Sequence, residues 1–149
     1  IAKYLTFILQ GLAILISVLT GIRLIQYVLI SHAGEAIEAT VLKKKIPEIA
    51  GPKPNPDFEL IFKANGAEKS LTVRGFNFFN PPIFFFTVFE TGPLKEQSKV
   101  LVWTFKNYFF LPFKPTKRHF SILGLSFLCY HIVLTFFILL VKYCSTKPV

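Results

Sequence analysis

Two long apolar runs lie near the ends of the chain, and a mixed segment separates them. Residues 5–22 form eighteen positions without a charge, and residues 120–141 form twenty-two. Runs of this length are typical of membrane-spanning helices, because a helix satisfies its own backbone hydrogen bonds where lipid offers none. We therefore expect transmembrane helices over 4–30 and 120–142, with an extramembrane domain over 34–115.

The middle segment contains a clear β-hairpin pattern. Phe58, Leu60 and Phe62 alternate with Glu59, Ile61 and Lys63, so one face of this run is expected to be buried and the other solvated. Asn65-Gly66 follows, and both residues tolerate the positive φ of a type I′ turn. Residues 67–73 are expected to form the returning strand.

Two further strands are expected, at 36–42 and at 99–105. Between the first of them and the hairpin, residues 46–57 carry four prolines and a glycine, which is typical of a loop. The predicted fold class is membrane α+β. Two transmembrane helices flank a small, mostly antiparallel β domain with a β-sandwich or barrel-like form.

Phenylalanine is concentrated between residues 75 and 89, where seven occur together with Pro81-Pro82. This segment could be domain core, a loop resting in the lipid headgroup region, or a contact surface for a partner. If the segment is domain core, residues 83–89 are expected to form a strand that is buried on both faces. The candidate docking residues, for a partner or for the membrane, are Phe76, Phe78, Phe79, Phe84, Phe85 and Phe86.

Basic residues outnumber acidic ones throughout the chain, with a formal net charge of +9. All eight acidic residues and thirteen of the seventeen Lys and Arg lie between His32 and His119. This balance favours anionic lipid as a partner over nucleic acid, because the basic residues are scattered. Lys114, Lys117 and Arg118 follow an aromatic cluster directly before the second run, a combination typical of an interfacial anchor.

The first apolar run carries two features that suggest contacts. Ala13, Ser17 and Gly21 recur every four residues, which places three small side chains on one stripe where another helix could pack closely. Arg23 interrupts the apolar pattern. It is expected to snorkel to the interface as a further anchor residue, with pairing to an acid of the domain or of another subunit as the alternative.

No catalytic motif is present, so we expect no enzyme activity and no metal or other cofactor. His131 is the one histidine inside an apolar run. A hydrogen bond across helices is its expected role, and ligation of a helix-bound cofactor is a weaker alternative. Cys129 and Cys144 are fifteen residues apart on one expected helix and cannot pair with each other.

The layout resembles a family of small bacterial two-helix membrane proteins with an inserted β domain, known only as a domain of unknown function. Three segments carry the resemblance: 34–44 (GEAIEATVLKK), the hairpin at 58–73, and the late strand at 99–105. The family's tyrosines are replaced by phenylalanines here. The resemblance implies an integral bacterial inner-membrane protein and assigns no site residues.

These observations together predict a non-catalytic accessory or scaffold subunit of a larger integral membrane complex, with other membrane subunits as partners. The first alternative is a membrane-surface module that binds lipid through basic and aromatic residues. The second is a helix-anchored cofactor protein using His131. Counting positive charges favours a cytoplasmic domain, but the segment is longer than the range in which that rule holds, so its side is left open.

Overall fold

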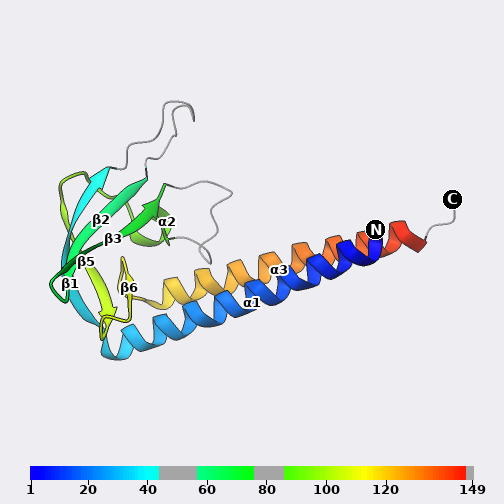
Figure 1. The fold of residues 1–149 in the computed structure, drawn as a ribbon, viewed down its shortest axis with the longest axis horizontal. Helices are drawn as coiled ribbons and strands as arrows, with labels where there is room; N and C mark the ends of the chain where they lie inside the picture. Colours follow the sequence, from blue (N-terminus) through cyan, green and yellow to red (C-terminus); the bar gives the residue numbers. More distant parts are fainter. Residues whose placement is uncertain (44–56, 76–85, 147–149) are drawn as a thin grey trace.

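Two long helices and a small β domain make up the chain (Figure 1). The structure is a computed structural model that describes residues 1–43, 57–75 and 86–146. Helix α1 (Ala2–Ala33) and helix α3 (Lys117–Thr146) lie side by side in opposite directions. Both helices are long and apolar enough to cross a membrane, and almost all of each apolar stretch is exposed in the isolated chain.

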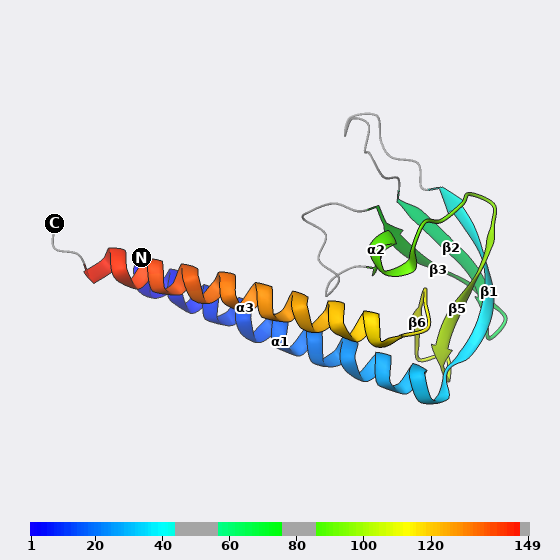
Figure 2. The ribbon, with the colours of Figure 1, turned by 180° about the vertical axis from the view of Figure 1, so that it is seen from behind.

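The described strands form one six-stranded sheet at one end of the helix pair (Figure 2). The strands are β1 (Glu35–Lys43), β2 (Phe58–Ala64), β3 (Ala67–Arg74), β4 (Phe86–Thr87), β5 (Lys99–Phe105) and β6 (Phe109–Leu111). Their order is β4-β3-β2-β1-β5-β6, and every pair is antiparallel except β3 with β4. The sheet curls into a half-barrel, so the barrel-like form holds and the two-sheet sandwich does not.

The hairpin predicted at Asn65-Gly66 is confirmed. Ala64 pairs with Ala67 across the turn, and the φ angles of Asn65 and Gly66 are 52° and 75°. Both are in the left-handed region that a type I′ turn requires. The turn fixes the register, so the alternating side chains of β2 all reach the intended face.

One face of the curled sheet holds the core of the β domain. Leu60, Val41, Val73 and Val102 are fully buried there, on four neighbouring strands. Burying one such side chain contributes roughly 1.5–3 kcal/mol. The opposite face mixes polar and apolar residues. Leu42 and Leu101 are exposed on it, and the exposed Lys99 Nζ lies 2.8 Å from Glu38 Oε1.

A second core joins the β domain to the helix pair. Tyr27 and Ile30 of α1 and Leu123 of α3 pack with Leu111 and Phe113 from the end of the domain. Helix α1 also passes directly into β1 through Gly34, whose N–H donates to the Ile30 carbonyl at 2.9 Å. A Cβ at Gly34 would stand 2.5 Å from that oxygen, so glycine is required for this close connection. Domain and helices are therefore packed together rather than joined by a loose linker.

The strand predicted at 83–89 is wrong at its end. Residues 83–85 lie outside the described residues, Phe86–Thr87 is a strand, and the chain then turns into the short helix α2 (Val88–Thr91). Thr87 is extended, and Gly92 ends the helical turn with a φ of 82°. This turn places Glu90 on the inner side of the domain, facing the helix pair.

Candidate functional site: a polar cluster at the helix–domain junction

Glu90 is the central residue of a buried polar cluster between α2 and the helix pair. Only 3% of Glu90 is exposed. Its Oε2 accepts a hydrogen bond from the Tyr27 hydroxyl at 3.0 Å, whereas Oε1 is buried with no hydrogen-bond partner among the described residues. Burying a carboxylate oxygen without a hydrogen-bond donor is costly, because the desolvation of that oxygen is then uncompensated.

His119 ties the backbone of the same residue to α3. Its Nδ1 accepts from the Thr116 N–H at 3.0 Å, so the ring proton must be on Nε2, which donates to the Glu90 carbonyl oxygen at 2.9 Å. The ring also stacks on Phe113, with 4.1 Å between centroids and planes 6° apart. Both helices therefore hold Glu90: α1 bonds the side chain of Glu90, and α3 bonds its backbone carbonyl.

Two arginines flank the cluster. The Arg23 guanidinium lies 4.2 Å from the centre of the Phe86 ring, a cation–π distance. Arg118 donates from its guanidinium to the Phe89 carbonyl oxygen at 2.6 Å. Arg23 thus rests against the β domain, and its charge acts on the buried Glu90 carboxyl.

The cluster holds the Glu90 carboxyl in an unusual electrostatic state. Burial raises the pKa of Glu90 from 4.5 to about 7, while the Tyr27 hydrogen bond and the Arg23 charge oppose that rise. The buried carboxyl therefore holds its proton more strongly than an exposed glutamate does. A carboxyl that titrates near neutrality is a feature of functional sites and of buried structural networks alike.

Local sequence patterns do not identify this cluster. Glu90 has no spacing to another acid that marks an acid–base pair, and His119 directly precedes the second apolar run. One signal was present: Arg23 and Tyr27 are four residues apart, so they share a face of α1 within an otherwise apolar run. That spacing indicates a polar partner, although nothing in the sequence identifies Glu90 as the partner.

The predicted small-residue stripe meets His131 of the other helix. Ser17 Oγ donates to the Ala13 carbonyl at 2.9 Å and lies 3.1 Å from His131 Nε2. Because the hydroxyl proton points to Ala13, His131 Nε2 is the donor to Ser17. Ligation of a cofactor through Nε2 would break this bond. At Gly21, an added Cβ would meet nothing within 4 Å, so α3 does not use this position.

We predict that the Ser17–His131 pair contributes about 0.6 kcal/mol to helix association, the average for such bonds between membrane helices. A double-mutant cycle with Ser17→Ala and His131→Ala, measured by unfolding in mixed micelles, should give that coupling energy. Thr20→Ala is the control, since its hydroxyl bonds only to Ile16 of its own helix. Equal losses for Ser17→Ala and Thr20→Ala, with no coupling to His131, would contradict the prediction.

The remaining candidate residues fall into three groups. Lys114, Lys117 and Arg118 are exposed at the start of α3, and Lys114 Nζ lies 5.0 Å from the Trp103 ring. Phe86 is half-buried inside the protein, between Arg23 and Phe113. Five docking candidates lie outside the described residues: Phe76, Phe78, Phe79, Phe84 and Phe85.

In the described ranges, no group of three His, Cys, Asp or Glu side chains could hold a metal ion. Cys129 and Cys144 are both free and exposed. Comparison with protein families, with curated proteins and with solved structures gives no match to this chain. Function must therefore be argued from the residues themselves.

Proposed function

We propose that this chain is a two-span integral membrane protein that serves as a non-catalytic accessory subunit of a larger membrane complex. One observation carries the proposal: two long apolar helices are almost wholly exposed, yet they are packed firmly onto a folded domain. Such a helix pair needs lipid or other helices around it. The firm junction suits a subunit that holds its domain at a set position beside a partner.

Three glycines support a protein partner rather than lipid alone. At Gly11, Gly21 and Gly124, an added Cβ would meet nothing within 4 Å. Each position leaves a shallow site where the backbone of another helix could approach. Glycine is unfavourable in a helix interior by roughly 1 kcal/mol relative to alanine. Close packing against another helix would offset this cost at the three positions.

We expect bulky residues at these glycines to release the partner while leaving the chain folded. The full-length protein would be extracted from its native membrane in a mild detergent, and the mass of the complex measured. Gly21→Leu and Gly124→Leu should shift the chain from a larger stoichiometric complex to the free chain. Val18→Leu, at an exposed position of the same helix, is the matched control. A wild-type chain that is always monomeric would refute the proposal.

A membrane-surface module is the second candidate, and a specific observation favours it. Lys114, just before α3, and Lys117 and Arg118, in its first turn, are all exposed. Lys114 lies over the Trp103 ring of β5, and Arg118 lies over the Phe89 ring of α2. Binding to vesicles through these residues would depend on anionic lipid and weaken with salt. Equal binding to neutral and anionic vesicles would exclude this function.

A further inference from the structure

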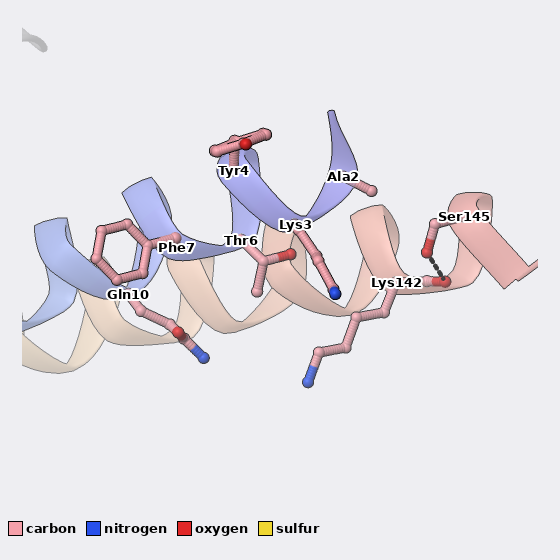
Figure 3. A pocket seen from close by; sticks show the side chains of 8 residues that line it. All are labelled: Ala2, Lys3, Tyr4, Thr6, Phe7, Gln10, Lys142 and Ser145. Atoms are coloured by element: carbon pink, nitrogen blue, oxygen red, sulfur yellow. Dashed lines mark hydrogen bonds between the residues drawn. The ribbon is translucent and has the colours of Figure 1, made fainter.

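A groove lies between the helix ends that are farthest from the β domain. It has a volume of about 740 Å³ and opens to one side. The first turns of α1 and the last turn of α3 line it (Figure 3). The lining residues are Ala2, Lys3, Tyr4, Thr6, Phe7, Gln10, Lys142 and Ser145.

Two lysines, one from each helix, give this groove a positive charge. Figure 3 shows the Lys3 and Lys142 side chains and the Gln10 amide directed to the same side. Neither helix contains an Asp or Glu, because all eight acidic residues lie between positions 35 and 96. In the part of the chain that the structure describes, neither lysine has an ion pair. The remaining length of α1 separates Lys3 from the domain end of the helix by roughly 45 Å.

The other groups in the groove complement this charge. Phe7 offers an apolar surface on the side toward the middle of the helices, and it is exposed in the isolated chain. Ser145 donates its hydroxyl proton to the Lys142 carbonyl at 2.8 Å (Figure 3). The ammonium groups of Lys3 and Lys142 are therefore the charged donors at the outer end of the groove, and the Phe7 ring and the Gln10 amide lie farther inward along α1.

We infer that this groove binds one anionic phospholipid, with its phosphate between Lys3 and Lys142 and an acyl chain along Phe7. Basic pockets between membrane helices favour anionic headgroups, and lysine binds phosphate as a point charge. The inference rests on the two helices crossing a bilayer, which is part of the proposed function. Lipid binding in this groove does not require a protein partner, so the lipid site and the accessory-subunit function can be refuted separately.

The test is native mass spectrometry of the purified full-length chain in micelles with equimolar phosphatidylglycerol and phosphatidylcholine. The wild type should retain phosphatidylglycerol preferentially at a ratio of one lipid per chain. K3Q combined with K142Q should reduce this preference about 25-fold, because each lysine near an anionic surface contributes roughly fivefold. K3R with K142R should keep the preference.

Lys63→Gln with Lys95→Gln is the matched control, because it removes two exposed charges from the β domain instead. That variant should keep the wild-type preference for phosphatidylglycerol. This result would support a local binding site in the groove and not an effect of the net charge of the protein. An unchanged preference in K3Q/K142Q would overturn the inference, and so would a wild type without preference. A preference lost equally in the control would overturn it as well.

Discussion

Replacing Phe113 with alanine is expected to lower the free energy of unfolding by about 3–5 kcal/mol, the usual cost of truncating a buried aromatic residue. Phe113 is 8% exposed and contacts three rings: those of Tyr27, Phe86 and His119. Its loss leaves a cavity at the point where both helices meet the domain. Unfolding followed by fluorescence of Trp103, the single tryptophan, would report this, because Trp103 packs against the same cluster.

Tyr108→Ala is the control for this substitution. It also removes an aromatic ring, but Tyr108 is 80% exposed, so its change should stay within about 0.5 kcal/mol. A loss below 1 kcal/mol for Phe113→Ala would show that the junction does not hold the domain to the helices.

Replacing Glu90 with glutamine is expected to stabilise the protein by about 1–3 kcal/mol at pH 8 and to have little effect at pH 5. The pKa of Glu90 rises from 4.5 to about 7 on folding. The folded state therefore binds more protons than the unfolded state between these values, and stability falls as pH rises through this window. This increase in the pKa of Glu90 corresponds to about 3 kcal/mol of unfolding free energy. The stabilisation by Glu90→Gln is expected to be smaller, because the NH2 group of the new glutamine has no hydrogen-bond acceptor.

The measurement is the unfolding free energy of the wild type and Glu90→Gln at pH 5 and pH 8. Gln keeps an oxygen for the Tyr27 hydroxyl, so the variant changes the charge and little else. Glu96→Gln is the control, at an exposed position of the same domain. If Glu90→Gln had the same effect at both pH values, Glu90 would not be the titrating group.

Local patterns predicted those parts of the fold that local sequence determines. The uncharged runs predicted both helices, and the alternation around Asn65-Gly66 predicted the hairpin with its register. The strand at Lys99–Phe105 was also predicted, from its β-branched and aromatic residues. In each case the signal lies within a dozen residues of the structure that it predicts.

The junction could not be predicted in this way, because its contacts join distant positions. Glu90 meets Tyr27 across 63 residues and His119 across 29. The parallel pairing of β4 with β3 also depends on contacts between distant residues. The same holds for helix α2 after β4, because the β-branched and aromatic residues of this segment favour continuing the strand. Burial of an acid next to a tyrosine leaves no periodic pattern along the chain.

The two native cysteines test most directly whether α3, together with the antiparallel α1 packed along it, crosses a membrane. Cys129 and Cys144 are both exposed in the isolated chain, Cys129 within the apolar part of α3 and Cys144 near its end. Single-cysteine variants would be treated with a membrane-impermeant maleimide in intact and in detergent-dissolved membranes. Two membrane spans predict that Cys129 reacts only after dissolution, whereas Cys144 reacts in intact membranes from the side opposite the β domain. Equal labelling of both cysteines in intact membranes would contradict the spans.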